Sequence, residues 1–123
     1  MKYSCLCIDD DKMFNEILEQ YIKRIDFLDF LGAYSNPIQG VMAIDKLKPD
    51  ILFLDVDMPE INGFTTIEAL EHKPIIIMVS SHYEQERELL KAGAARFVTK
   101  PIANPEHLSE IVKGVLEEQA TVK

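Results

Sequence analysis

Long apolar runs are missing from this sequence. The two longest, residues 51–54 and 75–79, fall far short of the roughly 20 apolar residues that a membrane-spanning helix needs. Near the N-terminus, Asp9, Asp10 and Asp11 interrupt the apolar stretch before it reaches the roughly 7 to 15 residues of a secretory signal. We therefore expect a cytoplasmic protein without a membrane anchor.

Basic residues are scarce as well. The chain has 13 lysines and arginines against 21 aspartates and glutamates, which gives a formal net charge of -8. A surface of this sign repels the phosphates of DNA and the headgroups of an anionic membrane. The composition therefore argues against direct binding to nucleic acid or to a membrane.

Cysteine is also rare. Cys5 and Cys7 stand two residues apart, which in a strand places their Cα atoms about 6.6 Å apart, near the upper limit for a disulfide. His72, His82 and His107 are scattered and lack the spacing of zinc ligands. We expect two buried free thiols and no metal bound through sulfur.

The pattern of the remaining residues predicts one α/β domain. Apolar runs alternate with stretches of helical periodicity, which is typical of a parallel sheet covered by helices on both faces. We expect five strands, each followed by a helix, at about residues 3–8, 27–33, 51–54, 75–79 and 97–99. Residues 1–119 would form the domain, and residues 120–123 a C-terminal tail or linker stub.

Apolar stripes and end signals predict the helices. The fourth helix, at about residues 83–92, is mostly polar and ends at Gly93, which suits a left-handed cap. Asn36 and Pro37 would open the second helix, which runs to about Lys48, and Asn104 and Pro105 would open the last. The apolar faces of the other four are expected to comprise Met13, Phe14, Ile17, Leu18, Tyr21 and Ile22; Ile38, Val41, Met42 and Leu47; Phe64, Ile67 and Leu70; and Leu108, Ile111, Val112, Val115 and Leu116.

Polar side chains follow four of the five predicted strands. Asp9 and Asp10 follow the first, Asp55 the third, Ser80 the fourth and Lys100 the fifth. In open parallel sheets, ligands bind beyond the carboxyl ends of the strands. Carboxylates that meet there repel one another unless one is protonated or a hard cation binds, and Mg²⁺ prefers such oxygen ligands.

Asp55 is the candidate nucleophile of this cluster. It follows four buried apolar residues, and an aspartate in that position needs a partner or a metal as compensation. A carboxylate beside Mg²⁺ can accept a phosphoryl group and become an aspartyl phosphate. Lys100 would offset the charge of that group, and the Ser80 hydroxyl could donate a hydrogen bond to it.

Four motifs in order resemble the receiver domains of bacterial two-component response regulators. They are Cys-Ile-Asp-Asp-Asp at 7–11, Leu-Asp-Val-Asp-Met-Pro at 54–59, Ile-Asn-Gly at 61–63 and Phe-Val-Thr-Lys-Pro at 97–101. Together they cover nearly the whole chain. The resemblance implies a flavodoxin-like doubly wound parallel sheet of strand order 2-1-3-4-5. It also implies a signalling switch, not an enzyme with a separate substrate, that promotes its own phosphorylation and dephosphorylation at Asp55.

The resemblance assigns further roles. Asp9, Asp10, Asp55 and the backbone carbonyl of Asp57 would bind Mg²⁺, and Lys100 and Ser80 would contact the phosphoryl group. Lys100 is usually joined to the following proline, here Pro101, by a cis peptide bond. Ser80 and Phe97 would act as the switch that alters the face formed by the fourth helix, fifth strand and fifth helix. Phe97 lacks the hydroxyl of the commoner tyrosine. Asp57 and His82 would modulate the lifetime of the phosphoryl group.

Simpler explanations exist for several of these residues. Asp10 or Asp11 could be only a helix N-cap, and Ser80 with Ser81 only a turn. Lys100 could merely end a strand in solvent, and Phe97 could be ordinary core packing. Asp57 and His82 could equally be solvated loop residues.

The resemblance also implies partners. A sensor histidine kinase or a phosphotransfer protein would supply the phosphoryl group, and two copies could dimerise through the switch face. The sequence of residues 55–63 is similar to that of receiver domains attached to LytTR-type DNA-binding domains. Whether such a transcription-regulating effector domain follows, or the receiver stands alone, is left open.

One rival function belongs to a different class. Asp55 and Asp57 after an apolar strand also resemble the nucleophile motif of haloacid-dehalogenase-type phosphatases. In that family a threonine or valine normally comes two residues after the second aspartate, where this sequence has Pro59. The motif also usually opens near the N-terminus. We therefore rank the phosphatase below the receiver domain.

Overall fold

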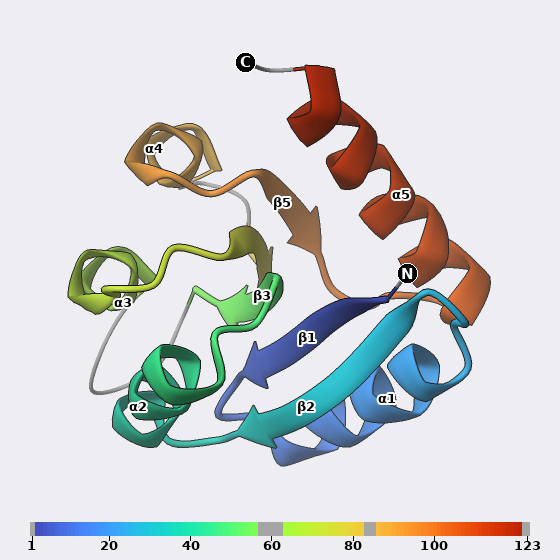
Figure 1. Ribbon diagram of the computed structural model, residues 1–123, viewed down its shortest axis with the longest axis horizontal. Helices are drawn as coiled ribbons and strands as arrows, with labels where there is room; N and C mark the ends of the chain where they lie inside the picture. Colours follow the sequence, from blue (N-terminus) through green and yellow to red (C-terminus); the bar gives the residue numbers. More distant parts are fainter. Residues whose placement is uncertain (1, 57–62, 83–85, 122–123) are drawn as a thin grey trace.

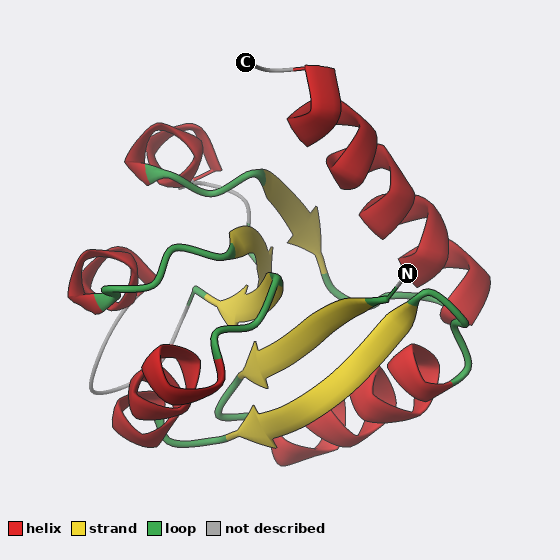
Figure 2. Cartoon of the chain, viewed as in Figure 1, coloured by secondary structure: helices red, strands yellow, loops and turns green. Residues whose placement is uncertain are grey.

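Strands and helices alternate along the chain and form one parallel sheet with helices on both faces. The computed structural model describes residues 2–56, 63–82 and 86–121 (Figure 1). The strand order is β2-β1-β3-β4-β5, as predicted, and every pair of neighbours is parallel. The elements are β1 Tyr3–Ile8, α1 Lys12–Lys23, β2 Leu28–Tyr34, α2 Pro37–Leu47, β3 Ile51–Asp55, α3 Gly63–Ala69, β4 Ile75–Ser80, α4 Glu86–Ala92, β5 Arg96–Thr99 and α5 Pro105–Thr121 (Figure 2).

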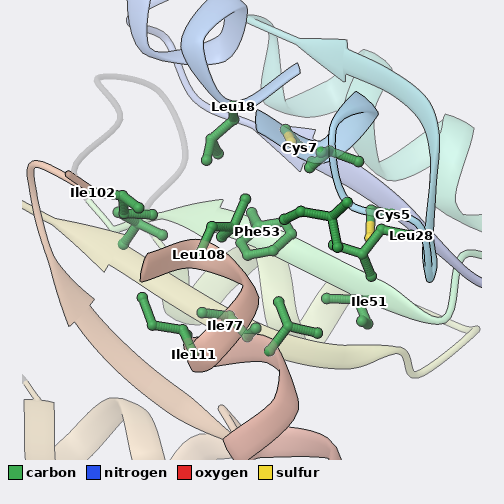
Figure 3. Packing of buried hydrophobic residues seen from close by; sticks show 14 of the residues in the cluster. Cys5, Cys7, Leu18, Leu28, Ile51, Phe53, Ile77, Ile102, Leu108 and Ile111 are labelled. Atoms are coloured by element: carbon green, nitrogen blue, oxygen red, sulfur yellow. The ribbon is translucent and has the colours of Figure 1, made fainter. Parts of the chain in front are cut away.

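The two faces of the sheet carry two separate apolar clusters. Side chains alternate along a strand, so Cys5 and Cys7 of β1 face α1 and α5, whereas Leu6 and Ile8 face α2, α3 and α4. On the first face, Phe53 of β3 lies among residues of the strands, α1 and α5 (Figure 3). The central strands β1, β3 and β4 are therefore covered on both sides, and their carboxyl ends are held rigidly.

Asp11 is the residue that caps α1. One of its carboxylate oxygens accepts hydrogen bonds from the backbone N–H groups of Met13 and Phe14, at 3.0 and 3.2 Å. These are N–H groups that an uncapped helix leaves without partners. Because Asp11 takes this role, the side chains of Asp9 and Asp10 are available for other interactions.

Several element boundaries differ from the prediction by one residue. β2 and β5 were expected to begin at Phe27 and Phe97, but they begin at Leu28 and Arg96. β3 and β4 extend one residue further than expected, because Asp55 pairs with Val79 and Ser80 with Thr99. Asp55 and Ser80 therefore belong to the ordered ends of their strands and not to the loops. The expected start of the fourth helix, at residue 83, lies outside the described residues.

The predicted apolar face of α2 was wrong for three of its four residues, since only Val41 packs against the core. Ile38 and Met42 are 54% and 67% exposed, and Leu47 is also exposed. The buried residues are instead Pro37, Gly40, Ala43 and Ile44. Small residues let the helix approach β1 closely: a Cβ atom at Gly40 would lie 2.5 Å from Cδ1 of Ile8. Helix α2 is apolar around much of its circumference, so periodicity alone did not identify the side that packs.

A similar correction applies to α1. Phe14, Leu18 and Ile22 are buried as expected, but Met13 and Ile17 are exposed. The true stripe is narrower than the predicted one, and the polar residue Asn15 lies on its buried side. The interior face of α1 therefore includes one amide.

The two cysteines are free and buried, as predicted. Burial, followed by the nearby carboxylates of Asp50 and Asp29, raises the pKa of Cys5 from 9.0 to about 12. Burial also raises the pKa of Cys7.

Within residues 2–56, 63–82 and 86–121, the structure has no helix with the length and apolar character needed to cross a membrane.

We expect both thiols to resist alkylation in the folded protein. A pKa near 12 lowers the thiolate fraction at pH 8 about a thousandfold relative to a free thiol. Iodoacetamide followed by mass spectrometry should detect slow labelling in buffer and rapid labelling of both cysteines in guanidinium. Because folding raises these pKa values, the associated stability should be complete below pH 9 and fall as the pH rises toward 12. Rapid native labelling at pH 8 would contradict the burial.

The close contact of α2 with β1 predicts opposite effects of alanine at two helical glycines. Gly40→Ala places a methyl group against Ile8 and should lower the free energy of unfolding by about 1–2 kcal/mol. At Gly114 in α5 the nearest atom outside the helix's own backbone would be a nitrogen of the flexible Arg96 side chain, 3.4 Å from the new Cβ, so Gly114→Ala should be neutral or stabilising by up to about 1 kcal/mol. Urea titration followed by circular dichroism measures both. Equal effects would contradict the packing.

Candidate functional site

Three carboxylates meet where β1 and β3 end. Each of Asp9, Asp10 and Asp55 offers one oxygen, and these oxygens all lie within 4.8 Å of one another. Asp9 and Asp55 are 2% and 5% exposed, whereas Asp10 is exposed. Ile8 pairs with Leu54, so the register of the two strands places Asp9 and Asp55 side by side. The structure thus brings together the carboxylates that the sequence singled out.

Lys100, which follows β5, adds the nearest positive charge. Its Nζ lies 2.8 Å from Oδ2 of Asp9 and 3.9 Å from Oδ1 of Asp55. The formal charges of three carboxylates and one ammonium leave the cluster with two negative charges in excess. The ammonium therefore offsets only part of the repulsion, and it lies nearer to Asp9 than to Asp55.

Asp9 is held through its main chain as well as its side chain. Its N–H donates to the carbonyl of Tyr34 at 3.0 Å, and its carbonyl accepts from Nδ2 of Asn15 at 2.8 Å. Oδ1 accepts from the N–H of Asp11 at 2.9 Å. Oδ2 accepts no well-aligned hydrogen bond from any residue described, so its contact with Lys100 is an ion pair defined by distance.

Lys100 also lies over an aromatic ring. Its Nζ is 4.4 Å from the centre of the Phe14 ring, which is within the range of a cation–π interaction. Phe14 is buried on α1 and lines a narrow crevice together with Asp9, Asn15 and Asp55. Phe14 thus contributes to the position of the ammonium in addition to its part in the core.

Ser80 ends β4 beside this cluster. The residue is fully buried, and its hydroxyl oxygen accepts a hydrogen bond from the backbone N–H of His82 at 3.0 Å. Its carbonyl accepts from the backbone N–H of Lys100 at 2.8 Å. His82 and Ser81 are exposed, and Asp57 lies outside the described residues. The ends of β4 and β5 are therefore tied together at the two residues expected to contact a phosphoryl group.

Two further predicted residues lie on β5 or just after it. Phe97 is half-buried and packs against the cluster under α2, α3 and α4. The peptide bond between Lys100 and Pro101 is cis, the isomer that the resemblance to receiver domains implies. Packing explains the position of Phe97 without a switch role.

One protein-family model matches most of this chain. Residues 5–113 match the model described as the response regulator receiver domain. The chain belongs to this family. As a receiver domain it is a signalling domain.

Curated relatives include longer proteins with a receiver domain. The transcriptional regulatory protein BtsR of Escherichia coli K12 is 32% identical over 99 residues, which cover 79% of this chain and 41% of BtsR. A response regulatory protein of Vibrio cholerae is 30% identical over 117 residues, which cover 94% of this chain and 49% of that protein. The chain thus spans less than half the length of either relative.

Solved structures have the same fold. The response regulator domain of Thermotoga maritima CheB has a TM-score of 0.81 at 25% identity, over 95% of this chain and 96% of that one. A CheY-like receiver domain from Methanospirillum hungatei JF-1 has a TM-score of 0.82 at 24% identity over the full length of both chains. The flavodoxin-like architecture predicted from the sequence is confirmed.

The acidic cluster of this receiver domain fits a hard divalent cation. Its donors are carboxylate oxygens, the ligands that Mg²⁺ prefers, and three of them lie within 4.8 Å of one another. Oδ2 of Asp9 has no well-aligned hydrogen-bond donor among the described residues. Asp9, Asp10 and Asp55 are therefore the described side chains that could hold such a cation.

Sequence analysis missed the contributions of Phe14 and Asn15 to the site. Phe14 was assigned only to the core of the receiver domain, because an aromatic residue on an apolar stripe gives no sign of the ammonium above it. Asn15 gave a weak signal: it is a polar residue three positions before Leu18 and seven before Ile22, and so on the buried side of α1. Recognising its partner required the tertiary structure.

The excess of negative charge predicts that neutralising Asp10 stabilises the cation-free receiver domain. Asp10→Asn removes one carboxylate beside Asp9 and Asp55, so its melting temperature in EDTA should rise by about 2–6 °C. The further rise that Mg²⁺ causes in the wild type should shrink, because a ligand is lost. Circular dichroism measures both quantities. Asp26→Asn, at an exposed turn, is the control, and an equal gain there would contradict a local effect.

Proposed function

We propose that this receiver domain accepts a phosphoryl group on Asp55 in a Mg²⁺-dependent reaction, from a sensor histidine kinase or a phosphotransfer protein. The observation that supports this most strongly is the position of Asp55. Its buried carboxylate ends a central strand, lies within 4.8 Å of the Asp9 and Asp10 oxygens, and is 3.9 Å from the Lys100 ammonium. A rigid, charged carboxylate in an acidic cluster is suited to covalent phosphorylation.

The transfer itself exchanges one bond for another. A carboxylate oxygen of Asp55 forms a bond to phosphorus, while the bond from phosphorus to the imidazole nitrogen of a phosphohistidine breaks and leaves its electron pair on that nitrogen. Bound through Asp9, Asp10, Asp55 and the backbone carbonyl of Asp57, Mg²⁺ would supply positive charge to the phosphoryl oxygens. Water later attacks the phosphorus, releases inorganic phosphate and restores the carboxylate.

Lys100 and Ser80 would contact the transferred group. Lys100 already lies between Asp9 and Asp55, so a small shift would pair its ammonium with the new phosphoryl charge. The Ser80 hydroxyl, buried at the end of β4, would donate a hydrogen bond to a phosphoryl oxygen. Asp57 and His82, which flank the site in the sequence, would modulate how fast water removes the group.

A change at Ser80 would reach the surface through β5. The backbone of Lys100 bonds to Ser80, and Phe97 pairs with Met78 of β4, so the ends and middles of the two strands are linked. Movement of the Ser80 side chain toward the phosphoryl group would be accompanied by repacking of Phe97 and would alter the face of α4, β5 and α5. Phosphorylation then favours one of two arrangements according to how differently it stabilises them.

The altered face would contact the downstream partner. Two copies of the receiver domain could dimerise through it, or it could contact a C-terminal DNA-binding effector domain; the relative BtsR is a transcriptional regulatory protein by name. We assign residues 1–119 to the receiver domain and residues 120–123 to a tail or the start of a linker. The helix α5 continues through Thr121, so this boundary rests on the sequence alone.

Acetyl phosphate with Mg²⁺ should add one phosphoryl group to the wild-type protein. Asp55→Asn should abolish the addition, because the amide removes the nucleophilic oxygen. Intact-mass spectrometry measures the product, and EDTA should prevent it. Asp26→Asn, a matched change at an exposed aspartate, should leave the addition unchanged.

Two results would contradict this function. Addition to Asp55→Asn at the wild-type level would show that another residue accepts the group. Steady turnover of an added phosphomonoester by the wild type would instead favour the phosphatase that uses Asp55 and Asp57, which no described observation favours.

A further inference from the structure

Asn15 is a buried amide on the apolar side of α1. It is 6% exposed and lies among Phe14, Leu18 and Ile22, which belong to the core. Burying an amide is costly unless its polar atoms find partners, and asparagine has a poor intrinsic preference for helices. The residue at this position therefore has a specific role or a specific partner.

The partner is the main chain of Asp9. Nδ2 of Asn15 donates to the Asp9 carbonyl at 2.8 Å across six residues, so the bond joins α1 to the end of β1. A carbonyl only accepts, which fixes the orientation of the amide. The bond acts together with those from Asp9 to Tyr34 and from Asp11 to Asp9, described above. These bonds fix the main chain and Oδ1 of Asp9, and Oδ2 remains for the acidic cluster.

The carbonyl oxygen of the Asn15 amide has no hydrogen-bond partner among the residues that the structure describes. This atom, Oδ1, is buried. The adjoining crevice, which Asp9, Phe14 and Asp55 also line, is nowhere wide enough to admit a water molecule. An unsatisfied buried acceptor is destabilising, and a leucine of suitable shape would remove it. The amide is thus a poor choice for stability alone.

We propose that Asn15 is a positioning residue for the cation site: its hydrogen bond to the Asp9 carbonyl holds the Asp9 carboxylate toward Asp10 and Asp55. This inference rests on the proposed function, because it concerns binding of Mg²⁺ by the same cluster. Groups that orient metal ligands commonly change metal affinity by about 10- to 100-fold when they are removed. Asn15 acts through Asp9 and has no part in the phosphoryl transfer itself.

Asn15→Leu and Asn15→Ala test the proposal. Both remove the donor without changing the charge of the site, so long-range electrostatics stay constant. Isothermal titration calorimetry with MgCl₂ should give a Kd about tenfold or more weaker for both variants than for the wild type. Gln20→Leu, the same kind of substitution at an exposed position of α1, should stay within about twofold. In EDTA, the melting temperature of Asn15→Leu should be equal to or higher than that of the wild type.

The outcomes separate this proposal from the proposed function. Mg²⁺ affinities of both Asn15 variants within about twofold of the wild type would overturn the positioning role while leaving phosphorylation intact. Absence of Mg²⁺ binding by the wild type would overturn both. Circular dichroism at the titration temperature checks folding; if both variants are unfolded there, the amide serves the fold and the proposal fails.

Discussion

Repulsion among the carboxylates at the ends of β1 and β3 is the constraint on which the rest of the site depends. Asp9 and Asp55 are buried side by side, with the exposed Asp10 close to both. Solvent does not screen the two buried groups well, and one ammonium from Lys100 cannot balance three negative charges. The fold tolerates this arrangement because strands covered on both faces hold the carboxylates in place. Under the proposed function this repulsion would favour binding of a divalent cation, so the feature that destabilises the cation-free cluster would also give it affinity.

Three consecutive aspartates have three different roles, which the local backbone assigns. Asp11 is at the N-cap, where its carboxylate is used by Met13 and Phe14 of α1. Asp9 directly follows β1, and its carbonyl and Oδ1 accept hydrogen bonds from Asn15 and Asp11. Asp10 remains exposed, with its carboxylate near the cluster. The backbone at the start of α1 thus makes one of three chemically identical side chains a helix cap and places the other two in the acidic cluster.

Much of this organisation followed from the sequence, and the exceptions have physical reasons. The strand order was predictable only through the resemblance to receiver domains, whereas the site placement followed from the residues, because polar side chains at the carboxyl ends of parallel strands lie at the same edge of the sheet. The buried face of α2 was not predictable, because Ile38 and Met42 are as apolar as the residues that pack, and Gly40 decides the side by allowing close approach. Asn15 was missed because hydrogen bonding, not hydrophobicity, explains its burial. Hydrophobic periodicity identifies apolar residues that are buried, but it does not identify the hydrogen-bond partner of a buried polar residue.

The position of Lys100 links the charge of the cluster to the outer face of the sheet. The ammonium is held by Asp9 and by the ring of Phe14 on α1, while its backbone N–H is bonded to Ser80 on β4. One residue therefore contacts the first strand, the first helix and the fourth strand. A new negative charge on Asp55 would compete with Asp9 for this ammonium, and any displacement would pull on the end of β5. Because Phe97 lies on β5 three residues before Lys100, the competition for one ammonium would give the proposed switch a physical route from the carboxylates to the packing beneath α4.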